Sequence, residues 1–310
     1  MSECLLGSEV RYDGSGARSS FPHAALAGLY EFRGICPEMG IGMSVPRPPI
    51  RLVARNGIRA VGVADGELDY TDALTAFAER QSAALDDVSG YVLMKNSPSC
   101  GLFRVKVYPE VDGSVSGAPG RTGRGIYAAT LARRLPDLPM EETGRLNDDV
   151  LRENFVMRTF AYAHWQQLVA RGLSRGGVIE FHSRYKYLLM AHSVPAYQAA
   201  GRMLSNLKED FPARARAYFS LLMQGLSVPA SKGGHANVLA HLQGYLKRVL
   251  DGESRQELAA LISAYRRGEQ PLLAPLALLK HHLRRHPDQY LLYQTYLDPH
   301  PPAAGLRRPL

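Results

Sequence analysis

The most constraining feature of this sequence is residues 91–101, where a short apolar run leads directly into a turn that carries a thiol. Residues 91–94 have the length and composition of a buried strand. Pro98 cannot donate to a strand ladder, so the strand must end before it. Gly101 lets the backbone turn tightly just after Cys100. The stretch predicts a strand whose carboxyl end presents Cys100, at the edge where open α/β sheets bind their ligands.

Two further cysteines, Cys4 and Cys36, also stand beside glycine or proline turns. Three cysteines are an odd number, and nothing at the start of the chain resembles a secretion signal, so we expect no disulfide framework. Intervals of 32 and 64 residues separate the cysteines, so only folding can bring them together. Three thiolates can hold zinc with a histidine or water as fourth ligand, or three irons of a 4Fe-4S cluster. Spacing alone does not choose between the two.

Helix and strand patterns divide the chain into two parts. Residues 71–85 have the apolar spacing of an amphipathic helix and precede the strand at residues 91–94, an alternation typical of an α/β layer. We therefore expect an α/β N-terminal domain, Rossmann-like with a mostly parallel sheet, followed by an all-α C-terminal domain. The expected ranges are 1–160 for the catalytic domain, 112–124 for a glycine-rich loop within it, 161–177 for a linker and the end of a connecting helix, and 178–310 for the helical domain.

Charge is distributed unevenly between the two parts. Residues 1–160 hold 18 Lys and Arg against 20 Asp and Glu, whereas residues 161–310 hold 19 against 9. The basic half suggests a polyanionic partner, and an arginine-rich soluble helical domain is the plain alternative. Cations alternate with aromatic residues there, as is usual in RNA-binding proteins, although most of the tyrosines are expected in the helical core. The candidate RNA contacts are His182, Arg184, Lys186, Lys247, Arg248, Arg284 and Arg285.

No apolar run in the sequence approaches the length of a membrane span. We therefore expect a cytoplasmic protein with no membrane partner. The basic half predicts RNA as the partner, and no DNA partner is expected.

Several motifs resemble those of a known family. CLLG, VRYDG, CPE, VPRPPIRLV, SPSCG, EETGRL and LRENF, across residues 1–155, resemble the TudS thiouracil desulfidase family. EFHSRYKYLLMAHS, HANVLAHLQGYLK, YRRGEQPLLAPLALLKHH and YLDPHP, after residue 178, resemble the YbgA-type helical domain. The fusion of the two is similar to bacterial desulfidases that convert 4-thiouridine in tRNA to uridine.

This resemblance implies a 4Fe-4S cluster held by Cys4, Cys36 and Cys100, in which the iron without a protein ligand accepts the sulfur of the thiolated base. Water then attacks the pyrimidine carbon and sulfide leaves, with no net redox change. Only three residues precede Cys4, fewer than the full strand that family members carry. We therefore expect Cys4 to be weakly supported and the cluster to be labile.

Three side chains near the cysteines are candidates for catalysis. Glu38, two residues after Cys36, is the expected general base or proton shuttle. Ser97 is the expected hydrogen-bond donor that orients the thiolated nucleobase or relays a proton. Ser99 is the second candidate for this role. In the alternative interpretation, Glu38 is a solvated turn residue and Ser97 bonds only its own turn.

Three other functions remain open on the sequence. The first is a desulfidase of free thiouracil or a thionucleotide, in which the helical half serves assembly. The second is a zinc-stabilised RNA-binding module without catalysis. The third is a structural protein with buried thiols, which the match of three cysteine motifs disfavours.

Overall fold

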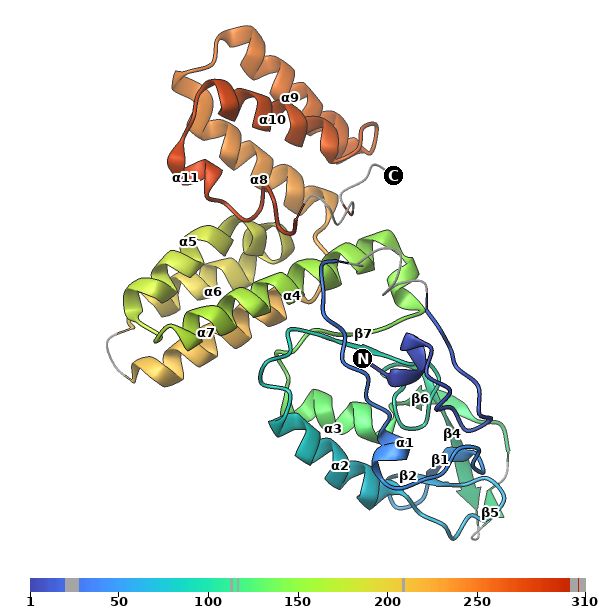
Figure 1. Ribbon diagram of the computed structural model, residues 1–310. Helices are drawn as coiled ribbons and strands as arrows, with labels where there is room; N and C mark the ends of the chain where they lie inside the picture. Colours follow the sequence, from blue (N-terminus) through green and yellow to red (C-terminus); the bar gives the residue numbers. More distant parts are fainter. Residues whose placement is uncertain (20–27, 112–113, 116, 208–209, 302–305, 307–310) are drawn as a thin grey trace. The chain divides into compact units, whose positions relative to one another are not determined.

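The chain folds into two compact units, Met1–Phe155 and Val156–Leu310. The computed structural model describes residues 1–19, 28–111, 114, 115, 117–207, 210–301 and 306 (Figure 1). The first unit mixes helices with small sheets, and in the described residues of the second unit all regular structure is helical. This confirms an α/β part followed by a helical part. The division falls inside helix α4 (Asp149–Ala170), which continues from one unit into the other.

The larger sheet of the first unit has the strand order β2-β1-β4-β5, with β6 also paired to β4. β1 pairs in parallel with β4, whereas β2, β5 and β6 run antiparallel to their neighbours. A second sheet pairs β3 in parallel with β7. The strands are β1 (Ile50–Ala54), β2 (Ile58–Gly62), β3 (Tyr91–Leu93), β4 (Val105–Val111), β5 (Ser114–Val115), β6 (Gly120–Gly123) and β7 (Met140–Glu142).

The expectation of one mostly parallel sheet is wrong for the described strands. β1 and β2 form a tight hairpin because Asn56 and Gly57 have φ values of 44° and 110°. Three residues separate the paired Ala54 and Ile58, and the positive φ values that this short loop needs fall on Asn and Gly, the residue types that tolerate them best. The glycine-rich segment expected as a loop also contributes β5 and β6 where it is described. There, Gly123 leaves room for the Val107 side chain, since a Cβ would lie 2.5 Å from Val107 Cγ2.

The short segment before Cys4 is held on both sides. The Ser2 nitrogen donates to the Val92 carbonyl in β3 at 2.9 Å, and Ser2 forms a parallel bridge with Ile35. The Glu3 nitrogen donates to the Ile35 carbonyl at 3.1 Å. The expectation that Cys4 is weakly supported is therefore wrong, because these pairings and the burial of Ser2 fix the chain just before the cysteine.

Helix α3 (Ile126–Arg134) stabilises the turn that carries Cys100. Its Ile126 nitrogen donates to the Pro98 carbonyl at 3.0 Å, and its Ala128 nitrogen donates to the Ser99 carbonyl at 3.1 Å. The first N–H groups of a helix have no partner inside the helix. These bonds therefore give partners both to the N–H groups of α3 and to the carbonyls of the turn. α3 packs against α2 (Thr71–Ala83), the helix expected at residues 71–85 (Figure 1).

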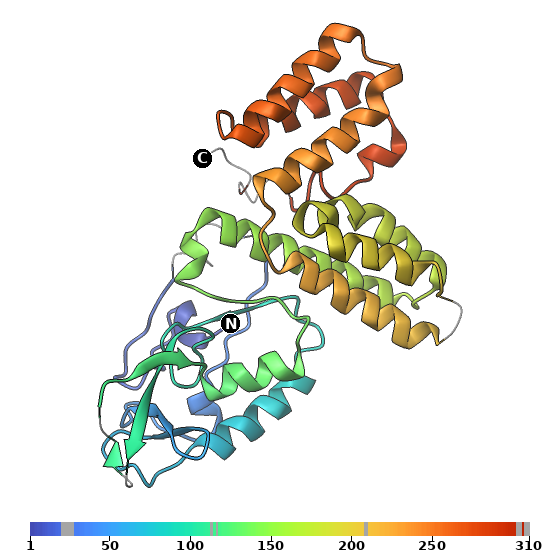
Figure 2. The same cartoon turned by 180° about the vertical axis from the view of Figure 1, so that it is seen from behind.

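The second unit is organised around α5 (Arg175–His192), which contacts the next three helices (Figure 2). Its core is rich in aromatic side chains, including Trp165 stacked on Phe219 with ring centres 4.6 Å apart. Serine or aspartate side chains cap the N-termini of α5, α6, α8 and α9, so these helices begin where capping chemistry predicts. The other helices are α6 (Val194–Leu204), α7 (Phe211–Leu226), α8 (Lys232–Tyr245), α9 (Gly252–Arg267), α10 (Leu273–Arg285) and α11 (Gln289–Leu292). Among the described residues, no helix combines the length and apolarity needed to cross a membrane.

We expect Gly125→Ala to destabilise the first unit. A Cβ at this position would lie 2.4 Å from the Ser99 carbonyl oxygen and 2.8 Å from the Cys100 nitrogen. Backbone atoms cannot yield as a flexible side chain does, and overpacking of this kind costs about 1–3 kcal/mol. The matched control is Gly66→Ala, whose Cβ would meet only the Arg55 side chain, at 3.9 Å. The measurement is thermal unfolding of the full-length protein, and equal melting temperatures for the two variants would contradict the close approach.

Candidate active site

The three cysteines line one pocket of about 290 Å³ in the first unit. Cys4 lies in the short helix η1 (Glu3–Leu6), Cys36 immediately precedes helix α1 (Pro37–Gly40), and Cys100 lies in the turn after β3. All three are free thiols; Cys100 is buried and the other two are half-buried. Folding thus brings together residues that are 32 and 64 positions apart in the chain.

Cys4 and Cys36 are neighbours because the segments before them run in parallel. Ser2 and Ile35 form the parallel bridge, so the chain leaves both segments at the same end. Parallel pairing brings the carboxyl ends of adjacent segments to one edge, as it does in larger open sheets. Each cysteine comes one or two residues after this bridge, at that common edge.

A serine-stabilised turn places Cys100 in the same pocket. The Ser97 hydroxyl oxygen accepts hydrogen bonds from the Ser99 nitrogen at 3.2 Å and from the Cys100 nitrogen at 3.0 Å. The Gly101 nitrogen donates to the Ser97 carbonyl at 2.8 Å. A Cβ on Gly101 would lie 2.3 Å from Val105 Cγ2, so a larger residue does not fit there.

The thiols are held in an environment that disfavours their free thiolates. Burial raises the pKa of Cys4 to about 11, and the nearby Cys36 sulfur adds to this effect. Burial likewise raises the pKa of Cys36 and of Cys100. The only recorded acceptor of the Cys36 thiol within the described chain is the Val10 carbonyl, at 3.8 Å. A metal centre bound in the pocket would supply the positive charge that thiolates need there.

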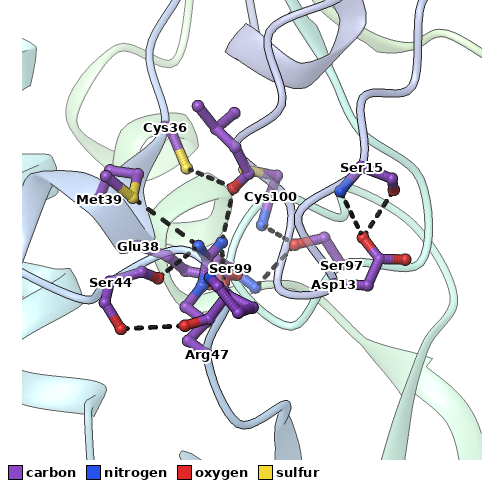
Figure 3. A network of polar contacts seen from close by, with 12 residues as sticks. Asp13, Ser15, Cys36, Glu38, Met39, Ser44, Arg47, Ser97, Ser99 and Cys100 are labelled. Atoms are coloured by element: carbon purple, nitrogen blue, oxygen red, sulfur yellow. Dashed lines mark hydrogen bonds and ion pairs between the residues drawn. The ribbon is translucent and has the colours of Figure 1, made fainter.

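Glu38 lies in this pocket as one partner of a buried ion pair (Figure 3). Its Oε2 accepts from Arg47 Nε at 2.7 Å, and Arg47 Nη2 lies 2.7 Å from the same oxygen. Its Oε1 accepts from the Ser99 hydroxyl at 2.8 Å. Only 13% of the Glu38 side chain and 4% of the Arg47 side chain are exposed. The alternative interpretation of Glu38 as a solvated turn residue is therefore wrong.

Arg47 also joins the chain segments around the pocket. Its Nη2 donates to the Val10 carbonyl at 2.9 Å, and its Nη1 donates to the Ser44 carbonyl at 3.2 Å (Figure 3). Because the Val10 carbonyl is also the acceptor for the Cys36 thiol, one guanidinium connects the segments that carry two of the cysteines. Sequence reasoning did not select Arg47. The available signal was a single cation inside the proline-rich run at residues 45–50.

The two candidate serines make different contacts in the structure. Ser97 lines the pocket, but its oxygen accepts the two turn hydrogen bonds, as the alternative interpretation stated. Ser99 is fully buried and holds the Glu38 carboxylate. Ser99 therefore positions Glu38, whereas Ser97 shapes the turn and faces the pocket.

Other residues at the pocket were also missed by sequence reasoning. Arg11, Tyr12 and Lys95 line it and add two cations and an aromatic ring. Behind the turn, the buried carboxylate of Glu142 accepts from the Leu102 nitrogen at 2.8 Å. Glu142 belongs to the EETGRL motif, which was noted only as part of the family resemblance.

The pocket offers three free thiols as its donor set for a metal centre. Within the described ranges, no three His, Cys, Asp or Glu side chains form a group that could hold one ion. The thiolates that hold an iron–sulfur cluster bind different iron atoms, so they lie farther apart than the ligands of one zinc. In their donor chemistry, the three thiols that line the pocket fit a 4Fe-4S cluster, which is held by cysteine thiolates.

The seven candidate RNA contacts all lie in the second unit. Burial, assisted by the nearby Lys186 cation, lowers the pKa of His182 to about 4, so this histidine is neutral at pH 7 and offers no cation to a phosphate. The Arg184 guanidinium lies over the Tyr293 ring, 4.4 Å from its centre. The exposed members of the set are Lys247, Arg248, Arg284 and Arg285.

Comparison with known proteins places both units in families. The model of the 2-thiouracil desulfurase family matches residues 1–143, and that of the family of unknown function DUF1722 matches residues 186–301. The chain is 40% identical over 157 residues to the uncharacterized protein YbgA of Escherichia coli (strain K12), covering 50% of this chain and 93% of YbgA. The chain belongs to the 2-thiouracil desulfurase family, with a second, YbgA-like DUF1722 domain.

Two further proteins resemble this desulfurase family member. The uncharacterized protein YbbK of Bacillus subtilis (strain 168) is 33% identical over 139 residues, which cover 42% of this chain and 87% of YbbK. The solved structure of the [4Fe-4S]-dependent thiouracil desulfidase TudS is 29% identical to this chain, and the match covers 47% of this chain and 90% of that one, with a TM-score of 0.37.

We expect Arg47→Met to destabilise the desulfurase domain strongly, because it leaves the Glu38 carboxylate buried without its cation. Removing one partner of a buried pair typically costs about 3–5 kcal/mol. The control is Arg33→Met, which breaks a pair with Asp87 whose side chains are 56% and 60% exposed. Exposed pairs contribute little to stability. Urea unfolding of the full-length variants tests this, and equal midpoints would show that the buried pair is no more important than the exposed one.

Proposed function

We propose that this protein is a desulfidase that converts 4-thiouridine in tRNA to uridine. The observation that carries the proposal is the meeting of three cysteines and a buried carboxylate in one pocket of a desulfurase-family domain. The basic charge of the second half supports RNA as the carrier of the thiolated base. A desulfidase of free thiouracil is the alternative, and the family's description favours it.

Cys4, Cys36 and Cys100 would hold a 4Fe-4S cluster in this proposal. The donor set is three thiols from separate segments, which leaves one iron without a protein ligand. When bound, the cluster would supply a Lewis acid with affinity for sulfur.

Glu38 is the proposed general base. The overall change replaces C=S by C=O: water adds to the pyrimidine carbon, the carbon–sulfur bond breaks, and sulfide leaves with the protons that water loses. Glu38 accepts a proton from that water. Arg47 and Ser99 fix the carboxylate by holding one oxygen each, so it does not have to reorganise during the reaction.

Ser97 and the two pocket cations have the remaining proposed roles. The Ser97 oxygen accepts two backbone N–H groups, and its own hydroxyl proton has no recorded acceptor among the described residues. That proton is available for a hydrogen bond to a polar atom of the thiolated nucleobase. Arg11 and Lys95 line the pocket and can attract an anionic substrate.

The first experiment is anaerobic incubation of the iron-reconstituted protein with tRNA that contains 4-thiouridine. We expect loss of the near-ultraviolet absorbance of the thiolated base together with release of sulfide. Cys100→Ala should abolish both signals and lower the iron content. If iron and sulfide are verified in the wild-type protein and free thiouracil alone is desulfurated, the tRNA assignment is wrong and the alternative substrate is supported.

Glu38→Gln tests the general base. We expect turnover per bound iron to fall by about 10²-fold or more, the typical size of a general acid-base contribution. The control is Glu67→Gln, the same chemical change at an exposed carboxylate outside the pocket. Wild-type turnover in Glu38→Gln would remove this residue from the mechanism.

A further inference from the structure

A second pocket lies on the helical unit, between α5 and α6. It has a volume of about 610 Å³ and is a wide, open groove. Two cations, Lys186 from α5 and Arg202 from α6, contribute to its lining. Neutral polar side chains line it as well, namely Ser183, Gln198 and Ser205. An open groove of this kind suits an extended ligand better than an enclosed small molecule.

The charge of this groove has one sign. Its described lining contains no carboxylate, and neither Lys186 nor Arg202 has a recorded acidic partner in the described chain. Other cations of the unit are already paired: Arg267 lies 2.6 Å from Glu269. Lys280 likewise pairs with the carboxylate of Asp298. The groove therefore retains positive charge that is available to an anion.

Aromatic side chains border the Lys186 end of the groove. The Lys186 amine lies 5.0 Å from the centre of the Tyr187 ring and 4.9 Å from that of Tyr290. Tyr187 donates a hydrogen bond to the Tyr245 hydroxyl at 3.0 Å, and Tyr245 is 45% exposed. Cations that bind phosphates beside exposed aromatic rings that stack on bases are the usual elements of single-stranded RNA recognition.

We propose that the α5–α6 groove binds the RNA backbone, with Lys186 and Arg202 on its phosphates and Tyr245 stacked against an unpaired base. The choice of RNA as ligand rests on the proposed function. Arg202 was not among the residues that the sequence suggested, because only the packing of α6 against α5 creates the groove. His182 also lines it, but as a neutral hydrogen-bonding group.

The test is a fluorescence anisotropy titration of labelled tRNA with the full-length protein, at salt concentrations from about 50 to 200 mM. We expect the double variant Lys186→Gln/Arg202→Gln to raise Kd about 10-fold or more. The slope of log K against log salt should shrink by about 1 for each lost phosphate contact. The control is Arg216→Gln/Arg266→Gln, which removes the same charge from exposed positions on α7 and α9. Its Kd should stay close to that of the wild type.

Two more variants separate the contacts from general effects on the fold. Lys186→Arg/Arg202→Lys keeps the charges and should retain most of the affinity. Tyr245→Ala should weaken binding and leave the salt slope unchanged, because stacking releases no counterions. Circular dichroism and melting temperature verify that each variant is folded.

The outcomes for the groove and for the enzyme activity are distinct. If the groove double variant and the control double variant weaken tRNA binding equally, RNA binding at the groove is contradicted and a diffuse electrostatic attraction is indicated. Wild-type affinity in the groove double variant would likewise contradict RNA binding at the groove. Binding is measured without sulfide release, so a protein that binds tRNA through the groove but does not desulfurate it contradicts only the proposed activity.

Discussion

The buried ion pair between Arg47 and Glu38 is the interaction on which the pocket depends. Burying a guanidinium is costly unless its donors are satisfied, and Arg47 meets this condition with Glu38 and with the carbonyls of Val10 and Ser44. Val10 follows Cys4 in the chain, whereas Glu38 and Ser44 follow Cys36, so the hydrogen bonds that satisfy Arg47 also join these two segments of the pocket wall. Cys36 shares the Val10 carbonyl as an acceptor, which couples the thiol to this network. The carboxylate proposed to act on water is therefore also a structural element.

The second constraint on the pocket is the close approach of backbones around Cys100. Gly101 and Gly125 lie where any Cβ would meet neighbouring atoms at less than 3 Å. The turn that carries Cys100 accepts hydrogen bonds from N–H groups of α3, and the Glu142 carboxylate binds the backbone just after it. A rigid turn of this kind keeps the free thiol of Cys100 in place without a disulfide. The excess positive charge of the protein lies in the second half of the chain.

Local patterns predicted much of the fold. The strand at residues 91–94 and the helix at residues 71–85 were identified within one or two residues, because apolar periodicity and turn residues specify them locally. The prediction of a mostly parallel sheet was wrong, since the Asn56-Gly57 hairpin signal was not weighed against the α/β pattern. Pairing between strands depends on partners distant in sequence, and a single sequence does not specify them.

The sequence by itself determined the thiols and their turns, the family motifs, the helical second half and its positive charge. Only the tertiary structure decided that three cysteines line one pocket and that Arg47 pairs with Glu38 there. It also decided that Ser99, 61 residues from Glu38, is the serine that holds the carboxylate. The physical reason is that turns and helices follow from neighbouring residues, whereas a pocket is made by contacts between segments that meet only when the chain packs its core.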